Sequence, residues 1–374
     1  MKKICYVVTI PLTIKAFFIP QLKYLANNGF EVTVICSFDE NLQQLLGDNI
    51  RYIPVEIPRG LSIQGSIVAI KKLKKIFKKE QFDLIQYSTP NAALYSSIAA
   101  RKAKCKSRNY HLMGFRYLGA SGMGRILLKS IEKITCKNST SIECVSNSNL
   151  NIGIQDRIFP KEKSVVVWNG STGGVDLNRF NFSERRNFRN EIRNMYQIGD
   201  NDFVYGFVGR ITKDKGIDEI LESFNRIEDA KLMMIGNAEG VDTLNQELYQ
   251  KSLMDGRVTY TGNVDNVEKY FAAIDVLLFP SYREGFGNVV IEAAAMGTPA
   301  IISNIPGPID AVNPDITALV VKDHDAADLF AAMSEIRLRN YERMGLLAKE
   351  YVCTHFDSAV LCERICDRKK YLLQ

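Results

Sequence analysis

Short apolar runs alternate with longer amphipathic stretches along the entire chain. Twelve runs of three to six residues read as buried strands; they cover residues 4–9, 32–36, 82–87, 110–112, 142–145 and 165–168, and then 203–208, 232–235, 258–261, 276–279, 300–303 and 318–321. One intervening helix is clear, because Phe18, Leu22 and Leu25 recur at helical spacing. Pro20 lies near its start and Gly29 closes it. This alternation predicts an α/β protein with two parallel sheets covered by helices.

The length of the chain indicates two domains. At 374 residues, with 46% apolar and 24% charged residues, it has the composition of an ordinary globular protein with room for two sizeable cores. The polar stretch 176–190 is the predicted linker zone, and the last segment reads as a helix. We expect domains at 1–180 and 181–352, followed by a C-terminal helix at 353–374.

Residues 279–297 combine a strand end, a glycine turn and a helix. They read Phe-Pro-Ser-Tyr-Arg-Glu-Gly-Phe-Gly-Asn-Val-Val-Ile-Glu-Ala-Ala-Ala-Met-Gly. The strand stops at Pro280, Asn288 can cap the helix, and Gly297 can end it. Backbone N–H groups at such a helix start attract anions, most often phosphate. The segment therefore predicts an anion-binding turn.

Two glutamates flank this turn, Glu284 before it and Glu292 eight residues later. The helix around Glu292 is apolar nearly all round, so we expect it to be buried. A buried carboxylate without a partner costs several kcal/mol, so Glu292 needs hydrogen-bond donors. The two hydroxyls of a ribose would supply them, and so would a backbone amide or a lysine in a structural role. Glu284 would stand beside the phosphates.

A second candidate site follows the strand at 203–208. Residues 207–216 read Phe-Val-Gly-Arg-Ile-Thr-Lys-Asp-Lys-Gly, which places Arg210 and Lys215 at the carboxyl end of that strand. Ligands bind at this edge of open α/β sheets, and two cations there suit a diphosphate. Taken alone, an arginine and a lysine after a strand are more typical of a solvated loop.

Together the two segments resemble the strand–Gly-Arg–loop–Lys-Gly element and the E-x7-E signature of retaining glycosyltransferases of family 4. The resemblance covers most of residues 200–350 and, more loosely, the first half. There, residues 169–176 are similar to a turn found among bacterial capsular and surface-polysaccharide transferases. The resemblance implies the GT-B fold, with two Rossmann-like parallel-sheet domains facing across a cleft. The first domain would bind the acceptor, the second the nucleotide-sugar, and the C-terminal helix would cross back to the first.

The resemblance also implies roles for single residues. Glu284 would contact hydroxyls of the donor sugar and Glu292 the ribose. Arg210, Lys215 and the amides of 286–288 would stabilise the charge that develops on the leaving diphosphate. The implied catalytic residues are Glu284, Arg210, Lys215 and His111, and the implied substrate-binding residues are Glu292, Gly285, Phe286, Gly287, Asn288, Val289, Gly209, Gly236, Asn237, Val264, Thr9 and Thr13.

The first half departs from the family pattern after its first strand. Many members have a Gly-Gly loop there, close to the donor phosphates, whereas residues 9–15 read Thr-Ile-Pro-Leu-Thr-Ile-Lys. Thr9, Thr13 or Lys15 would fill that role. His111 would contact the donor sugar or its diphosphate, although the sequence fits a buried, hydrogen-bonded histidine equally well. The base is expected near 236–237 and 262–264.

No metal or other cofactor is implied by the resemblance. Two D-x-D triplets, at 200–202 and 323–325, do not follow a buried strand as metal-binding triplets usually do, so we interpret both as turns. The eight cysteines show no CxxC spacing, and the Cys362–Cys366 pair has no nearby histidine at ligand spacing. This pattern predicts reduced thiols in a cytosolic protein.

Charge is unevenly distributed along the chain. Residues 1–170 contain 25 lysines and arginines against 11 acidic residues, whereas the remainder is acidic overall. We interpret the basic half as a surface for an anionic membrane. Two stretches suit this role: the lysine-rich segment 70–79, and the glycine-rich segment 114–124 with the basic stripe Arg125, Lys129 and Lys133 after it. For the lysine-rich segment the alternative is a solvated helix. For the glycine-rich segment the alternatives are a loop that closes on a lipid-linked acceptor and a core-packed loop. No nucleic-acid partner is expected, because the lysines lack aromatic interleaving.

The residues and the resemblance together predict a retaining, metal-independent hexosyltransferase. It would move a hexose or N-acetylhexosamine from a nucleotide-sugar, with uracil as the expected base, to a polyprenyl-diphosphate-linked glycan in surface-polysaccharide synthesis. No apolar run reaches about 18 residues, so we expect a cytoplasmic protein peripherally associated with the inner face of the membrane. The alternatives are a GT-B-like sugar-nucleotide epimerase and a catalytically inactive, membrane-recruited binding protein.

Overall fold

The computed structural model describes residues 1–58, 60 and 63–374, which divide into two compact units. The first unit contains Met1–Gly173 and Ser358–Gln374, and the second contains Gly174–Asp357. The boundaries therefore lie at 173/174 and 357/358, where the sequence led us to expect 180/181 and 352/353. No helix among the described residues has the length and apolarity needed to cross a bilayer.

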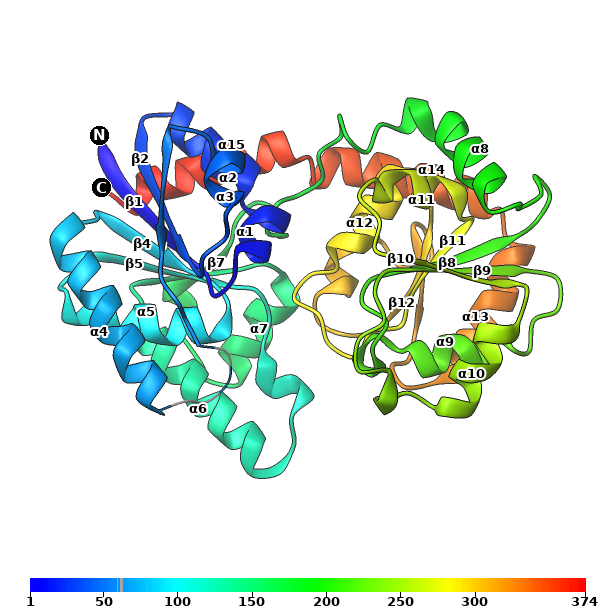
Figure 1. The fold of residues 1–374 in the computed structure, drawn as a ribbon, viewed down its shortest axis with the longest axis horizontal. Coiled ribbons are helices and arrows are strands. Elements are labelled where there is room, and N and C mark those ends of the chain that lie inside the picture. The colour runs from blue at the N-terminus through cyan, green and yellow to red at the C-terminus, as the bar shows by residue number, and fades with distance from the viewer. Residues whose placement is uncertain (59, 61–62) are drawn as a thin grey trace. The chain divides into compact units, whose positions relative to one another are not determined.

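The first unit is built on a seven-stranded parallel sheet in the order β3-β2-β1-β4-β5-β6-β7 (Figure 1). The strands are β1 (Lys2–Val7), β2 (Phe30–Cys36), β3 (Ile50–Pro54), β4 (Leu84–Tyr87), β5 (Ser107–Leu112), β6 (Ser141–Cys144) and β7 (Ser164–Val166). The strand order reverses between β1 and β4. The sequence missed β3, an edge strand in which Ile50 alone is fully buried, so its apolar pattern is weak.

Alternate residues of each strand serve two cores, one on each face of this sheet. In β1, Cys5 and Val7 face one core, and Ile4 and Tyr6 face the other. The first core is covered by α4 (Ile63–Glu80), α5 (Pro90–Lys102), α6 (Gly122–Asn138) and α7 (Asn147–Gln155). The second is covered by α1 (Pro11–Phe17), α2 (Ile19–Asn27), α3 (Leu42–Leu46) and α15 (Ser358–Tyr371).

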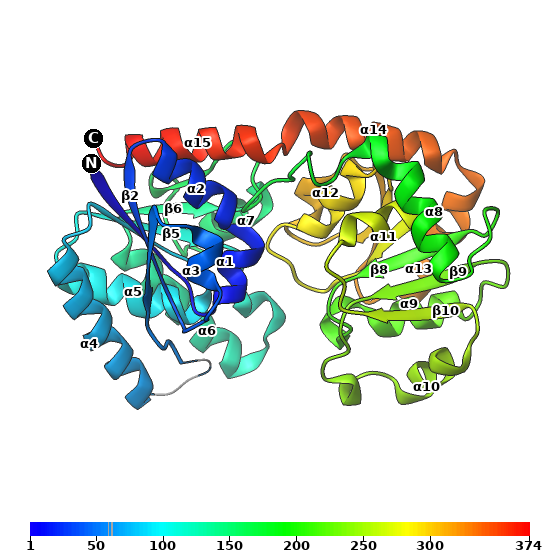
Figure 2. The same ribbon diagram turned by 45° about the horizontal axis from the view of Figure 1, so that its top comes forward.

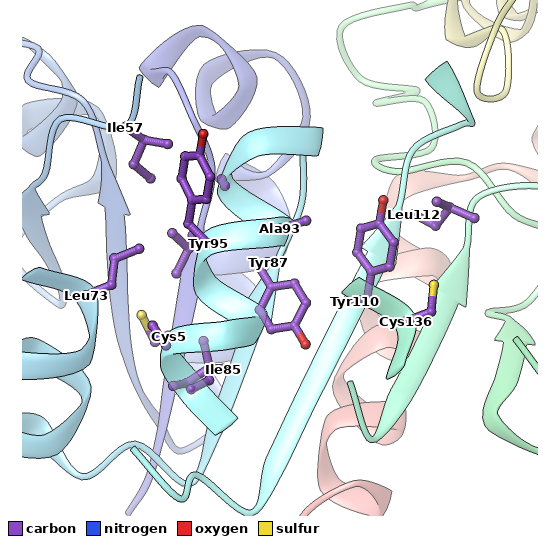
Figure 3. Close-up of a cluster of buried hydrophobic side chains, with 14 of the residues drawn as sticks. Cys5, Ile57, Leu73, Ile85, Tyr87, Ala93, Tyr95, Tyr110, Leu112 and Cys136 are labelled. Carbon is purple, nitrogen blue, oxygen red and sulfur yellow. The ribbon is translucent and has the colours of Figure 1, made fainter. Parts of the chain in front are cut away.

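Two tyrosines lie at the centre of the first core. Tyr87 of β4 and Tyr110 of β5 stack with ring centroids 6.0 Å apart, and Cys5 and Cys136 lie in the same cluster (Figure 3). On the opposite face, α15 packs beside α2, as both ribbon views show (Figures 1 and 2). The end of the chain is therefore an integral part of the first unit.

The second unit is built on a six-stranded parallel sheet in the order β10-β9-β8-β11-β12-β13. The strands are β8 (Val204–Val208), β9 (Lys231–Ile235), β10 (Val258–Gly262), β11 (Val276–Phe279), β12 (Ala300–Ser303) and β13 (Ala318–Val321). All six predicted strands are present, and the last three have the predicted bounds. The prediction of two Rossmann-like parallel-sheet domains is therefore confirmed.

Two helical layers flank the second sheet (Figure 2). One contains α9 (Ile217–Phe224), α10 (Gln246–Met254) and α13 (Ala326–Leu338), and the other contains α8 (Arg185–Met195), α11 (Val267–Ala273), α12 (Asn288–Ala295) and α14 (Tyr341–His355). The predicted linker 176–190 is wrong, because this stretch lies inside the second unit and enters α8. Polar residues of this stretch are used for packing: Arg189 donates a hydrogen bond of 2.8 Å to the buried Asp275, and Arg193, further along α8, donates another of 2.9 Å.

Candidate functional site

The second sheet makes the ends of β8 and β11 neighbours at the point where its strand order reverses. Ligands of open parallel sheets bind outside the carboxyl ends of the strands at such a point. Residues 209–216 follow β8 and residues 280–287 follow β11, so both sequence motifs flank the same place.

Close backbone approach explains two glycines of these loops. A Cβ on Gly236 would lie 2.0 Å from the Gly209 carbonyl oxygen, and a Cβ on Gly216 would lie 2.2 Å from the Pro280 oxygen. Both glycines also have positive φ, 136° and 73°. Any other residue would push apart the loops that follow β8, β9 and β11.

Lys215 and Glu284 meet where the two loops converge. The Lys215 Nζ lies 2.5 Å from the Glu284 Oε1, and each side chain is 17% exposed. An ion pair so shielded from water is stronger than a surface pair, yet both partners keep some accessible surface. The structure thus joins one residue of each motif in a single charged pair.

Arg210 lies further toward solvent than Lys215. Its guanidinium is 3.3 Å from Glu239, and both side chains are more than half exposed. Exposed pairs of this kind contribute little to stability. Arg210 can therefore exchange its carboxylate partner for a ligand at small cost.

The positive charge around this loop is evident from the lowered pKa of Asp214. Burial alone would raise that pKa, but the Thr212 hydroxyl and three cations, Lys215, Arg210 and Arg283, outweigh burial and lower it. Arg283 was missed by the sequence analysis. The available signal was its position directly before Glu284.

The Gly-Phe-Gly turn is anchored by its phenylalanine. Phe286 is buried and packs edge to face on Phe356, with ring centroids 5.3 Å apart. The predicted cap at Asn288 is wrong: Gly287, with φ of 104°, takes the N-cap position, and the helix begins at Asn288 itself. Gly297 follows the helix with φ of 73°, so the predicted helix end is confirmed.

The start of α12 is held firmly in place. A Cβ on Gly307 would lie 2.8 Å from the carbonyl oxygen of Gly285, so the turn is packed against a neighbouring loop. The first N–H groups of a helix, here those of Asn288 and Val289, point out of its N-terminus. The turn therefore fixes the direction in which the first amides of α12 point.

Glu292 lies inside α12 among buried alanine and isoleucine side chains and is itself partly exposed. Burial raises the pKa of Glu292 to about 7, with Arg179 opposing the rise and Glu268 adding to it. Arg179 is engaged by Glu268 at 2.9 Å. Within the part of the chain that the structure describes, Glu292 has no hydrogen bond or ion pair. Its carboxylate is therefore available to accept hydrogen bonds from hydroxyls of a ligand.

The residues expected near the base lie on the other side of β8. The Gly236 N–H donates to the Gly262 oxygen (2.9 Å), and the Ile211 N–H donates to the Asn237 oxygen (2.8 Å). These bonds connect the loops that follow β8, β9 and β10. Asn237 is exposed and Val264 is half-buried at the ends of β9 and β10.

Thr9 and Thr13 line a pocket of about 300 Å³ in the first unit. The pocket lies where the order of the seven-stranded sheet reverses, after β1 and β4. Thr89 and Arg116 line it too, and the hydroxyls of Thr9 and Thr89 are 2.8 Å apart. Thr89 has φ of 64°, a strained value for a β-branched residue. Sequence reasoning missed Thr89 as a site residue.

Lys15, the third residue considered for this region, has a different partner. Its Nζ lies 2.7 Å from the Asp39 carboxylate, and the contact is partly shielded from solvent. The hydrogen bond from Lys15 also lowers the pKa of Asp39. Thr9 and Thr13 are therefore the better candidates for a substrate contact.

His111 lies on β5 and is 6% exposed. Its Nε2 is 3.3 Å from the Thr172 hydroxyl, and its Nδ1 is 3.9 Å from a Glu143 carboxylate oxygen. Burial lowers the pKa of His111, and the nearby Glu143 only partly offsets the effect, so the imidazole is neutral at pH 7. The buried, hydrogen-bonded histidine is thus observed, and the catalytic role of His111 stays a prediction.

The glycine-rich segment 114–124 is packed into the core at its aromatic end. Phe115 and Tyr117 are buried, and their ring centroids lie 5.0 Å apart, so the interpretation that both enter a membrane is wrong. The contact of Phe115 with Phe159 explains the difference, because a partner distant in sequence covers the ring. The exposed apolar residue of the segment is Met123.

Both D-x-D triplets form turns, as predicted. Asp202 accepts a hydrogen bond of 2.8 Å from the Gly199 N–H, and it contacts Lys231 at 3.1 Å. Asp325 caps α13 by accepting a bond of 2.9 Å from the Asp328 N–H. The carboxylates of Asp202 and Asp325 are thus used for local structure.

Comparisons with known proteins agree with this geometry. Residues 188–346 match the family described as glycosyl transferases group 1, and residues 3–146 match the family described as glycosyl transferase 4-like. The fold is similar to the structure of HepE from Anabaena in complex with UDP, with a TM-score of 0.80 and 18% identity over 99% of this chain and 100% of that one. The chain is therefore a glycosyltransferase with the GT-B fold, whose second half matches the first of these families and whose first half matches the second.

Two relatives are similar over nearly their whole length. The capsular polysaccharide biosynthesis glycosyltransferase CapM of Staphylococcus aureus is 28% identical, over 92% of this chain and 91% of CapM. The UDP-Gal:alpha-D-GlcNAc-diphosphoundecaprenol alpha-1,3-galactosyltransferase of Escherichia coli is 24% identical, over 93% of this chain and 90% of that protein.

Proposed function

We propose that this glycosyltransferase moves a hexose or N-acetylhexosamine from a UDP-sugar to a polyprenyl-diphosphate-linked glycan during surface-polysaccharide assembly, with retention at the anomeric carbon. The observation that carries the proposal is the Lys215–Glu284 pair at the switch point of the second sheet, beside the start of α12. The names of the two relatives support the donor and acceptor classes, since one uses UDP-Gal and a diphosphoundecaprenol acceptor and the other builds a capsule.

The proposed donor chemistry needs positive charge around the diphosphate. Breaking the glycosyl–phosphate bond leaves negative charge on the diphosphate oxygens, and Lys215, Arg210, Arg283 and the first amides of α12 supply its stabilisation. Lys215 would exchange Glu284 for phosphate as the donor binds. Glu284 would then accept hydrogen bonds from hydroxyls of the donor sugar. With these groups the reaction needs no metal.

The proposed ribose contact explains the state of Glu292. Its pKa of about 7 shows that the folded protein disfavours the carboxylate in the absence of a partner. Two ribose hydroxyls would donate to that carboxylate and favour its ionised form. Nucleotide binding should therefore lower the pKa of Glu292.

A membrane-facing surface is proposed on α4 and α6, which flank α5 on one side of the first sheet (Figures 1 and 2). Each helix combines exposed aliphatic residues with exposed lysines. The aliphatic residues are Ile67 and Val68 on α4, and Met123, Ile126, Leu127 and Ile134 on α6, and their side chains are 46–81% exposed. Apolar residues beside lysines are typical of helices that lie in the interface of anionic membranes. This surface would bring the enzyme to a lipid-linked acceptor.

A nucleotide panel tests the donor site. The melting temperatures of the wild type, Glu292→Ala and the control Glu247→Ala, which changes an exposed residue of α10, are compared with UDP, GDP, ADP and NAD. A ligand at 100 times its Kd adds about 2.7 kcal/mol of stability. We expect UDP to stabilise the wild type and the control but not Glu292→Ala. If none of the four ligands shifted the melting temperature of the wild type, the result would contradict the proposal.

A further inference from the structure

A buried ion pair connects the C-terminal helix to β6 in the first unit. Glu143 of β6 and Lys369 of α15 are 3% and 0% exposed. The Lys369 Nζ donates to both carboxylate oxygens, at 2.9 and 2.7 Å. Burying two charges is costly, and apolar residues of similar volume often serve stability as well or better. A contribution to stability therefore does not by itself explain why Glu143 and Lys369 are charged residues.

His111 is the residue next to this pair. In the parallel register of β5 and β6, His111 is the direct neighbour of Glu143. The imidazole is held on three sides: its Nδ1 faces Glu143 at 3.9 Å, its Nε2 faces the Thr172 hydroxyl at 3.3 Å, and Phe18 packs edge to face at 5.6 Å. The 3.9 Å separation is within ion-pair reach and longer than a direct hydrogen bond.

The charges of Glu143 and Lys369 largely offset each other beside His111. Glu143 is ionised, since Lys369 and the His111 contact outweigh the effect of burial and lower its pKa. Lys369 loses part of its basicity through burial, which lowers its pKa, and Glu143 opposes that change. Other ionisable groups packed nearby are Arg368 of α15, 3.6 Å from Glu143, Tyr6 of β1, Cys144 of β6, and Cys362 and Cys366 of α15.

A lone carboxylate beside His111 would favour the imidazolium, because opposite charges stabilise each other. Because Lys369 offsets the charge of Glu143, the carboxylate can orient the imidazole ring without favouring its protonated form. An Nδ1–H directed at Glu143 leaves the Nε2 lone pair as a hydrogen-bond acceptor, as is common when a carboxylate fixes a histidine tautomer.

We propose that Glu143 and Lys369 are positioning residues that hold His111 as a neutral imidazole with its proton on Nδ1. His111 then accepts a hydrogen bond at Nε2 from Thr172 or from a hydroxyl of the donor sugar, rather than serving as a cation for the diphosphate. Because Lys369 belongs to α15, the C-terminal helix becomes part of the reaction machinery. The catalytic consequence rests on the proposed function.

The test reads the tautomer of His111 directly. The chain has three histidines, so nitrogen-15 NMR of histidine-labelled full-length protein is simple to assign with His111→Gln. The variants are Glu143→Gln/Lys369→Met, which removes both charges at similar volume, and Lys369→Met alone. Lys369→Arg restores the charge. Lys370→Met is the matched control, since it removes an exposed positive charge from the same helix that does not contact Glu143.

The wild type and Lys370→Met should show His111 protonated on Nδ1. The double variant should lose this preference, keep a melting temperature near that of the wild type, and lose roughly tenfold or more in kcat with little change in KM for the nucleotide-sugar. Lys369→Met should raise the pKa of His111 and move the acid limb of the pH–rate profile to higher pH. Lys369→Arg should bring both quantities back toward their wild-type values.

The same tautomer in the wild type and the double variant would overturn the proposal, and so would a changed tautomer with unchanged kcat. The tautomer measurement needs no substrate. A failure of UDP to bind would therefore refute the proposed function without affecting this reading of His111.

Discussion

Replacing Glu292 with glutamine should stabilise the protein, and more so at high pH. The folded protein raises the pKa of this carboxyl from 4.5 to about 7, so ionisation is disfavoured in the folded state. The contribution of the protonated Glu292 carboxyl to the free energy of unfolding is fully present below pH 4.5. It is lost as the pH rises through about 7. Glu292→Gln keeps the shape of the side chain and removes this loss.

The size of the effect follows from the pKa displacement. At about 1.4 kcal/mol per pH unit, the part that changes between pH 5.5 and 8.5 is roughly 2 kcal/mol. Because the side chain is partly exposed, we reduce this to about 1–2 kcal/mol. For a domain of the size of the second unit, that corresponds to about 2–8 °C in melting temperature.

Scanning calorimetry of the ligand-free protein at pH 5.5 and 8.5 provides the assay. The advantage of Glu292→Gln over the wild type should grow by that amount from the lower to the higher pH. The control Glu247→Gln removes an exposed carboxylate and should show no such growth. An advantage that is equal at both pH values, or larger at pH 5.5, would refute the reasoning.

Three further predictions address the remaining parts of the site. Lys215→Ala should lower kcat by roughly 10²–10³-fold, because it removes a cation from the leaving diphosphate, whereas the exposed neighbour Lys213→Ala should retain activity; equal rates for the two variants would contradict the role of Lys215. Ile126→Gln/Leu127→Gln should weaken sedimentation with anionic phospholipid vesicles at an unchanged melting temperature, and Leu338→Gln, a 90% exposed residue of the second unit, should bind vesicles like the wild type. Initial rates should be the same with and without EDTA, and a loss that Mg²⁺ or Mn²⁺ restores would show that a metal takes part.

The order of elements was largely predictable because buried parallel strands are short, apolar and rich in β-branched residues. β11, β12 and β13 are short and apolar and were found with their bounds. β3 was missed because an edge strand is only partly buried and shows a weaker pattern. The start of α12 was misplaced by one residue, because the sequence does not reveal that Gly287 adopts a positive φ.

The donor site was predictable to the extent that it depends on residues within one motif. The contact between Lys215 and Glu284 joins two motifs about seventy residues apart, and the order of the strands brings it about. Thr89 and the Glu143–Lys369 pair gave no local signal, because their partners come from distant segments. The burial of Phe115 and Tyr117 depends on Phe159 in the same way.

The most direct test of the central claim is a product analysis with UDP-sugars and undecaprenyl diphosphate that carries a short glycan. We predict that UDP is released only when this acceptor is present, and that NMR of the product shows the anomeric configuration of the donor. Conversion of the UDP-sugar to its epimer without acceptor would contradict the account in favour of an epimerase. Binding of UDP without any turnover in the presence of this acceptor would contradict it in favour of an inactive binding protein.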